Sequence, residues 1–207
     1  MNIEQRSPEW YAARCGSLGA SQVADAIART KTGWGASRAN VMATLIAERM
    51  TGTTSESYSN AAMRWGIDTE PQARAMYELY SGWDVVEVGI FKHPAISWTH
   101  ASPDGVIGDY GLVEIKAPNT ATHIDTLLTQ SIDGRYITQM QWQMACSGAH
   151  WCDFVSFDPR MPEELQLWVR RVERDVNRIG ELEDMVATFL AELDAKLARL
   201  QMLRGME

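Results

Sequence analysis

Apolar residues recur every three to four positions in the first and last parts of the chain, a spacing that predicts helices. Ser7 followed by Pro8 is typical of a helix start, with Ser7 as the cap and Pro8 in the first helical position. The Gly-, Ser- and Thr-rich stretch 30–40 predicts a loop, and the polar stretch 51–59 predicts a linker. The predicted helices are 8–14, 21–29, 41–50, 60–80, 135–146 and 175–203.

The middle of the chain has a different pattern, in which short β-branched runs and strict alternation predict strands. The predicted strands are 83–92, 98–101, 111–117, 151–157 and 165–172. Strands interspersed with helices predict a mixed α/β (α+β) fold, with a central mixed sheet flanked by helices and a long helix at the C-terminal end. A length of 207 residues with 45% hydrophobic content favours one domain over 1–207.

The strand at 111–117 carries two charged side chains on one of its faces. Because side chains alternate along a strand, Glu114 and Lys116 share a face, while Val113 and Ile115 point the other way into a core. The sequence therefore predicts an acid and an amine side by side.

A second carboxylate precedes this strand by about one hairpin. Asp104 lies in Ser-Pro-Asp-Gly, and the stretch 108–111 is rich in turn residues, so a hairpin would bring Asp104 beside Glu114. Two adjacent carboxylates repel unless a cation lies between them. Oxygen ligands of this kind favour Mg²⁺, with Mn²⁺ as a substitute. Lys116 could then orient the attacking water, or act as a base where its surroundings lower its pKa.

Each part of this pattern also has a purely structural interpretation. Glu-x-Lys on a strand is common as a solvated pair, and Asp-Gly is usually a turn. The order of Pro-Asp, a hairpin-length gap and Glu-x-Lys followed by Pro118 favours a site for phosphodiester hydrolysis.

These residues resemble the PD-(D/E)xK nuclease site, and in particular that of the phage lambda-type (YqaJ-like) recombination exonucleases. The resemblance extends along most of the chain through several ordered blocks, namely 9–14, 19–21, Trp65-Gly66 with Glu70, 139–141 and 157–161. It implies a restriction-endonuclease-like core. It also implies a Mg²⁺-dependent double-stranded DNA exonuclease that works 5′ to 3′ and produces 5′-mononucleotides and 3′ single-stranded overhangs.

Further properties follow from the resemblance alone. It implies duplex ends as substrate, preferably 5′-phosphorylated, a ring-shaped homotrimer, and a single-strand annealing protein as partner. If the gene is carried by a phage, the protein is expected in the cytoplasm of a bacterial host. The odd number of cysteines, three, fits a reducing compartment. No apolar run reaches membrane-spanning length, so no membrane association is expected.

The resemblance also assigns roles at the metal site. Asp104, Glu114 and the Ile115 carbonyl are expected to hold metal, and Glu70 to act from a neighbouring helix through a metal-bound water or from further out. Gln139 is expected at the active site, although the aromatic residue that usually follows four positions later is replaced by Gln143.

Arg14, Ser21 and Ser102 match positions that bind the terminal 5′-phosphate in the family. From the residues alone, Arg14 would be read as a surface ion-pair residue and Ser21 as a helix cap. The loop with Lys31, Trp34 and Arg38, together with Met63, is a candidate for DNA contact, by gripping the duplex backbone or wedging between bases.

A net charge of −8 runs against DNA binding, because phosphate neutralisation by Lys and Arg supplies much of the affinity. Acidic residues concentrate after residue 162, which leaves room for a basic surface elsewhere. Two other interpretations stay open. A restriction-like or structure-specific endonuclease would share the metal site, and a non-catalytic DNA-binding module would keep the fold without the chemistry.

Overall fold

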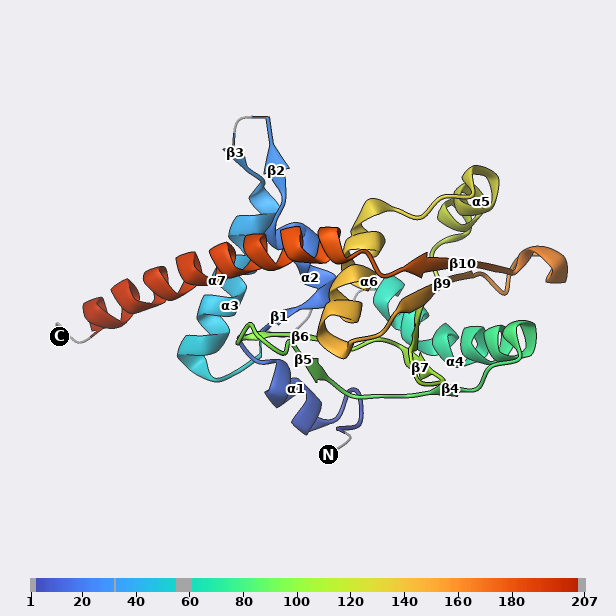
Figure 1. Ribbon diagram of the computed structural model, residues 1–207, viewed down its shortest axis with the longest axis horizontal. Coiled ribbons are helices and arrows are strands. Elements are labelled where there is room, and N and C mark those ends of the chain that lie inside the picture. Colours follow the sequence, from blue (N-terminus) through green and yellow to red (C-terminus); the bar gives the residue numbers. More distant parts are fainter. Residues whose placement is uncertain (1–2, 32, 55–60, 205–207) are drawn as a thin grey trace.

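A five-stranded mixed sheet forms the centre of the computed structural model, which describes residues 3–31, 33–54 and 61–204 (Figure 1). The strand order is β10-β9-β8-β7-β4, in which β8 and β9 are parallel and the other neighbours antiparallel. The bounds are β4 Val85–Val86, β7 Gly105–Ile107, β8 Gly111–Lys116, β9 Trp151–Phe157 and β10 Leu167–Glu173. The predicted mixed sheet flanked by helices is confirmed.

Helices cover the two faces of this sheet, as the alternation in β8 predicts. Val113 and Ile115 pack with Tyr77 of α4 (Ala61–Ser81). Leu112, from the opposite face, packs in a larger cluster that includes Met140 of α6 (Gly134–Ser147). Glu114 and Lys116 therefore lie on the α6 side.

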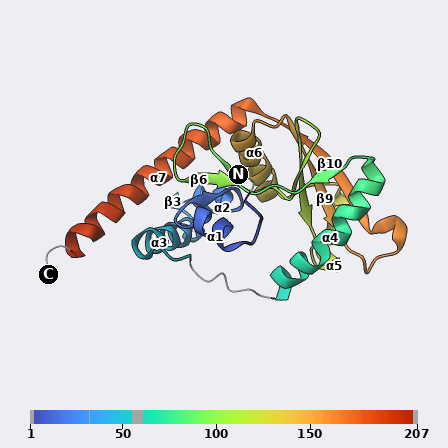
Figure 2. The ribbon, with the colours of Figure 1, turned by 90° about the horizontal axis from the view of Figure 1, so that it is seen from below.

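The N-terminal helices are joined to the middle of the chain by a small second sheet, in the order β1-β6-β5. β1 (Leu18–Gly19) runs parallel to β6 (Thr99–Ala101), which pairs with β5 (Phe91–Lys92). The helices are α1 (Pro8–Arg14), α2 (Ala20–Ala26) and α3 (Ala36–Thr51), and Figure 2 shows them grouped on one side of the molecule, with α4 on the other. Because β6 leads directly into Ser102, this pairing brings α1 and α2 to the predicted metal site.

The long C-terminal helix α7 (Val176–Arg204) is confirmed, but only part of it is buried. Its core-facing residues, Ile179, Leu182, Val186, Phe189, Leu190 and Leu193, pack under α3 and α6. After Leu193 the apolar side chains of Leu200, Met202 and Leu203 are exposed, and the helix extends past the body (Figure 1).

Two predictions about the elements were wrong, and one helix was not predicted. The stretch 30–40 is not a loop, because β2 (Arg29–Thr30) and β3 (Gly33–Trp34) form a hairpin and α3 begins at Ala36. The run 83–92 is divided between β4 and β5, which belong to different sheets. The unpredicted helix is α5 (Thr120–Thr129), and the Asn119 side chain caps it by accepting a hydrogen bond from the Thr122 amide. A single 3₁₀ turn (Glu163–Leu165) precedes β10.

Helix α4 is anchored at both ends by aspartates of β9 and the residues just after it. Near its C-terminal end, the Tyr77 hydroxyl donates a hydrogen bond to Asp153 over 2.8 Å, and Arg171 donates to both oxygens of that carboxylate. Near its N-terminal end, the Arg160 guanidinium lies 4.5 Å from the centroid of the Trp65 ring and is held by Asp158. Pro71 lies inside the helix without ending it.

Tyr77→Phe tests the C-terminal anchor. The substitution removes one buried hydrogen bond to a charged group, so we expect a loss of about 1.5–3 kcal/mol in the free energy of unfolding, measured by urea denaturation. Tyr110→Phe, at an exposed tyrosine, is the control and should change stability by less than about 0.5 kcal/mol. Equal stability of the two variants would contradict the anchoring role.

No helix among the described residues is both long and apolar enough to cross a bilayer.

Candidate active site

The β7–β8 hairpin brings Asp104 and Glu114 together, as predicted. Gly105 pairs with Val113 in the antiparallel ladder, so Asp104, one residue earlier, comes beside Glu114. The backbone amide of Ile115 donates a hydrogen bond to the Asp104 carboxylate over 2.6 Å. The two carboxylates are thus held by the hairpin itself.

Glu114 is 1% exposed, and both of its oxygens have partners. Lys116 and the Gln139 amide, at 2.6 Å, donate to one oxygen. The Gln143 amide donates to the other oxygen over 2.5 Å. The predicted place of Gln139 at the site agrees with this geometry, and Gln143 occupies the neighbouring position.

Lys116 is held as an ammonium ion between acidic groups. Burial opposes its charge, but Glu114 and Asp104 outweigh burial and raise the pKa of Lys116 above its ordinary value. The Tyr136 ring lies 5.2 Å from its Nζ. Of the two roles that the sequence leaves open, the arrangement favours orienting a water over accepting a proton in the metal-free protein.

Whereas the surroundings of Lys116 favour its charged form, those of Asp104 disfavour its charged form. Burial first, and then the charge on Glu114, raise the pKa of Asp104 well above its ordinary value, although Lys116 and the Ile115 amide oppose the shift. Glu70 adds to the repulsion, which places its charge near the site. Two repelling carboxylates in one place favour a cation between them.

Glu70 comes from α4 and is paired with two arginines. Arg6 donates to one carboxylate oxygen and Arg74, at 2.9 Å, to the other. These bonds hold Glu70 close enough to Asp104 to influence its charge, without placing it against Glu114. This geometry fits a role for Glu70 near the metal site without direct binding of the metal.

The donors present fit Mg²⁺ better than a softer metal. Within the described residues, no three His, Cys, Asp or Glu side chains cluster as a metal site. The candidate donors are Asp104, Glu114 and the Ile115 carbonyl, which lies on the same side of β8 as the amide bonded to Asp104. Such a small set of oxygens suits an ion that keeps several waters and takes phosphate oxygens as ligands.

The three residues predicted to bind a phosphate line one small cavity next to this site. Arg14, Ser21 and Ser102 enclose about 30 Å³ together with Gln139 and Gln143, the two residues that hold Glu114. This is room for about two water-sized groups. The predicted phosphate site and the predicted metal site are therefore neighbours, separated by the side chains of Gln139 and Gln143.

Within this cavity, Arg14 and Ser102 are both linked to Trp10. The Arg14 guanidinium lies 3.9 Å from the Trp10 ring centroid, and the ion pairs among the described residues do not include Arg14. The Ser102 hydroxyl donates to the Gly89 carbonyl over 2.8 Å and accepts from the Trp10 indole over 3.1 Å. An anion would have to draw the Ser102 hydrogen away from Gly89.

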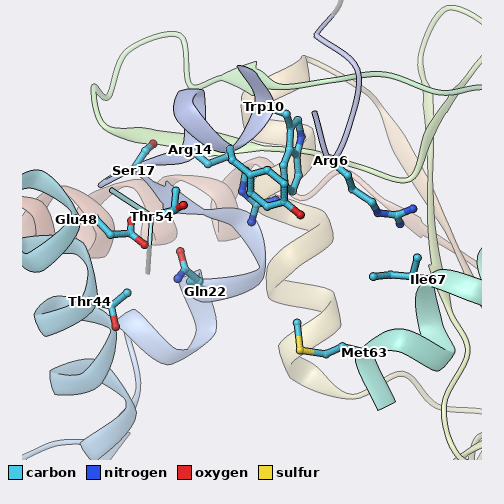
Figure 3. Close-up of a pocket in the computed structure, with 11 residues that line it drawn as sticks. Arg6, Trp10, Arg14, Ser17, Gln22, Thr44, Glu48, Thr54, Met63 and Ile67 are labelled. Atoms are coloured by element: carbon cyan, nitrogen blue, oxygen red, sulfur yellow. The ribbon is translucent and has the colours of Figure 1, made fainter. Parts of the chain in front are cut away.

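Arg14 also lines a larger cavity of about 440 Å³ (Figure 3). Trp10 and Arg14 from α1 line one side, and Met63 and Ile67 from α4 line the other. Tyr11 of α1 is also part of the lining. Met63 is 45% exposed, and its contact with DNA stays a prediction.

The remaining candidates for DNA contact lie elsewhere. Lys31 is exposed at the tip of the β2–β3 hairpin, which projects from the body (Figure 1). Arg38, predicted in the same loop, is instead 3% exposed in α3, where it donates to the Ala26 carbonyl and pairs with Glu192. The prediction that Arg38 belongs to a DNA-gripping loop was therefore wrong, because a helix begins where the loop was expected.

Gln143 and Tyr136 were not predicted at the site. Gln143 lies four residues after Gln139, a spacing that puts both amides on one helix face, and this was the available signal. Tyr136 lies one turn before Gln139, so the aromatic group near the lysine is supplied from the other end of α6.

Comparisons with known proteins show which family and which structures this chain resembles. Residues 9–150 match the model of the YqaJ-like viral recombinase domain. Two structures of the alkaline exonuclease LHK-Exo from Laribacter hongkongensis, one in complex with dAMP, are 50% identical, cover 97% of this chain and 99% of their own, and have TM-scores of 0.90 and 0.91.

A phage-related exonuclease from Haemophilus somnus 129PT, 13% identical, has the same fold, with a TM-score of 0.73 over 89% of this chain and 96% of its own. The comparison with curated proteins gave no match. The family match covers more than half of the residues, including every element that forms the carboxylate site, and the chain belongs to the YqaJ-like viral recombinase family.

Proposed function

We propose that this protein is a Mg²⁺-dependent exonuclease that digests one strand of duplex DNA from its 5′ end, releases 5′-mononucleotides and leaves a 3′ single strand. One observation carries the proposal. The small cavity with Arg14, Ser21 and Ser102 shares a wall with Gln139 and Gln143, which hold the carboxylate expected to bind metal. A phosphate bound there would present the adjoining nucleotide to that carboxylate.

The similarity to LHK-Exo supports the same reaction. That protein is an alkaline exonuclease, and one of its structures contains dAMP, a deoxynucleoside monophosphate of the kind that exonuclease digestion of DNA releases. Its identity with this chain, 50% over nearly the full length of both, supports the transfer of a DNA exonuclease activity.

Each residue has a separate task in the proposed mechanism. Asp104, Glu114 and the Ile115 carbonyl would hold Mg²⁺, which when bound supplies an acidified water and neutralises charge on the phosphate. Lys116, kept cationic by Glu114, orients the attacking water. Gln139 and Gln143 fix the Glu114 carboxylate, and Glu70 adds negative charge from α4.

A structure-specific endonuclease would use the same carboxylates but would not need a cavity for a terminal phosphate. It would cut closed circular DNA, whereas an end-directed enzyme leaves such circles intact. A non-catalytic binding module is disfavoured by the intact Asp104, Glu114 and Lys116. EDTA should abolish digestion of linear DNA, and excess Mg²⁺ should restore it.

The chemistry of the DNA end tests the proposal directly. We expect linear duplexes with a 5′-phosphate to be digested at least about ten-fold faster than those with a 5′-hydroxyl, because a hydrogen-bonded ionic contact contributes roughly 1.5–3 kcal/mol. Arg14→Gln should reduce this ratio to near one. Strand-specific labels would report the rate and the polarity.

Arg29→Gln is the matched control, since Arg29 is exposed and its guanidinium lies over Trp34 in the β2–β3 hairpin. This variant should keep the ratio. Faster digestion of 5′-hydroxyl ends, or release of nucleotides from the 3′ end, would contradict the proposed polarity.

The broader assembly also belongs to the proposal. A ring-shaped homotrimer that surrounds DNA is supported by the family resemblance and by the exposed apolar residues of α7 after Leu193. A single-strand annealing protein would use the 3′ strand, and a bacterial cytoplasm would be the setting. Met63 would wedge at the strand fork and Lys31 would contact the duplex, with Mn²⁺ able to replace Mg²⁺.

A further inference from the structure

His100 of β6 is a buried histidine with only one of its two ring nitrogens in use. The residue is 3% exposed, and its Nδ1 lies 2.9 Å from the Ser17 hydroxyl. Its Nε2 is buried and has no hydrogen-bond partner among the described residues. Buried polar atoms are almost always paired, so this nitrogen calls for a partner from outside the described residues, a water or a ligand.

The unpaired nitrogen lies beside Gly19, and both His100 and Gly19 line the small cavity that also contains Arg14. His100 lines this cavity together with Ser21 and Ser102. A Cβ atom at Gly19 would lie 3.3 Å from His100 Nε2 and 3.7 Å from Nη2 of Arg14. The two nitrogens thus converge beside the backbone of Gly19, where a larger residue would crowd them.

The chemistry of the ring decides what it can offer to an anion. Burial first, and then the charge on Arg14, lower the pKa of His100 to about 3, so the ring is neutral near pH 7. When the Ser17 hydroxyl donates to Nδ1, the ring hydrogen is on Nε2. An anion in the cavity favours this tautomer, because a lone pair on Nε2 would repel a phosphate oxygen.

We propose that His100 Nε2 donates a hydrogen bond to the terminal 5′-phosphate of the DNA, as a fourth member of the site formed by Arg14, Ser21 and Ser102. Ser17 acts through His100 as a positioning residue that fixes the tautomer. The assignment rests on the proposed function, and it adds a neutral donor that distinguishes a phosphate from a hydroxyl at the end of the strand.

Two amide substitutions separate the two nitrogens of the ring. An asparagine amide reaches about as far as Nδ1, so His100→Asn keeps a partner for Ser17 and loses the donor to the phosphate. A glutamine amide reaches about as far as Nε2, so His100→Gln restores that donor. We expect His100→Asn to lower the ratio of 5′-phosphate to 5′-hydroxyl digestion rates about ten-fold, and His100→Gln to keep most of the wild-type ratio.

Ser17→Ala provides a second variant that leaves the imidazole in place, and it should lower the same ratio by a smaller factor. His123→Asn is the matched control, because both nitrogens of that buried ring have partners in Ser156 and Leu165. It should change stability without changing the ratio. Thermal unfolding of each variant separates loss of folding from loss of phosphate recognition.

The outcomes distinguish the two levels of inference. No Mg²⁺-dependent digestion by the wild-type protein would overturn the proposed function itself. Digestion with a 5′-phosphate preference that His100→Asn leaves unchanged would overturn the assignment of His100 alone. If His100→Asn slows digestion equally on 5′-phosphate and 5′-hydroxyl ends, His100 has only a structural role, and this result would also overturn the assignment.

Discussion

Asp104→Asn is expected to abolish digestion while making the metal-free protein more stable. The loss of activity should be at least about 10³-fold, because the site then lacks one of its two carboxylate metal ligands and one of the charges that attract the metal. The gain in stability follows from the raised pKa of Asp104, since folding brings a carboxylate into a buried place beside Glu114. Asparagine keeps an oxygen for the Ile115 amide and removes the charge.

The pH dependence of this gain has a definite sign. Folded Asp104 holds its proton more tightly than the unfolded chain does, so the metal-free wild type loses stability as the pH rises above the ordinary carboxyl pKa. Asp104→Asn should therefore raise the melting temperature by a few degrees near pH 8, where about 1 kcal/mol corresponds to about 2–4 °C, and by nothing near pH 3.

Calorimetry in EDTA measures this effect, and Asp109→Asn is the control, because Asp109 is exposed in the turn of the same hairpin. A lower melting temperature for Asp104→Asn at pH 8 would contradict the proposed repulsion. Retained Mg²⁺-dependent digestion would contradict its role as a metal ligand.

Lys116→Gln should also abolish digestion, but with the opposite effect on stability. Without the ammonium ion, Glu114 and Asp104 face each other with no compensating charge, and removal of one partner of a buried ion pair is strongly destabilising. We expect a loss of about 2–3 kcal/mol in EDTA, reduced because Lys116 is partly exposed. Digestion should fall by at least about 10²-fold, the usual size of an acid–base or orienting contribution.

Added Mg²⁺ should restore part of the stability of Lys116→Gln, because the cation supplies the missing charge. Urea denaturation with and without Mg²⁺ measures this difference. Lys92→Gln, at an exposed lysine of β5, is the control and should respond to Mg²⁺ as the wild type does. Failure of Mg²⁺ to stabilise the Lys116 variant more than the control would count against a cation at this place.

The carboxylate site was predictable because its parts lie close together in the sequence. Asp104, Glu114 and Lys116 belong to one hairpin, so turn chemistry and the alternation of a strand are enough to bring them together. The phosphate cavity needed the family resemblance. Arg14 and Ser102 meet only because β1 pairs with β6, and β1, with two residues, is too short to leave a readable pattern.

The residues that were missed depend on tertiary packing. Gln143 and Tyr136 reach the site only because α6 packs against β8, and His100 only because β6 faces Gly19. Helix α5 was missed because its threonine-rich sequence has low helix propensity, which the cap at Asn119 and packing on β9 outweigh. Local signals were weakest where the structure depends on contacts between distant segments.

Helix α4 carries both Met63, which lines the large cavity, and Glu70, whose charge acts on Asp104. Met63 and Glu70 are seven residues apart, which is close to two full turns, so they lie on nearly the same helix face about 10 Å apart. Both ends of the helix are fixed to β9 and the residues after it by Asp153 and Asp158. The spacing between Met63, which lines the large cavity, and Glu70, which lies near the carboxylates, is therefore fixed by the rise of an α-helix that is tied down at both ends.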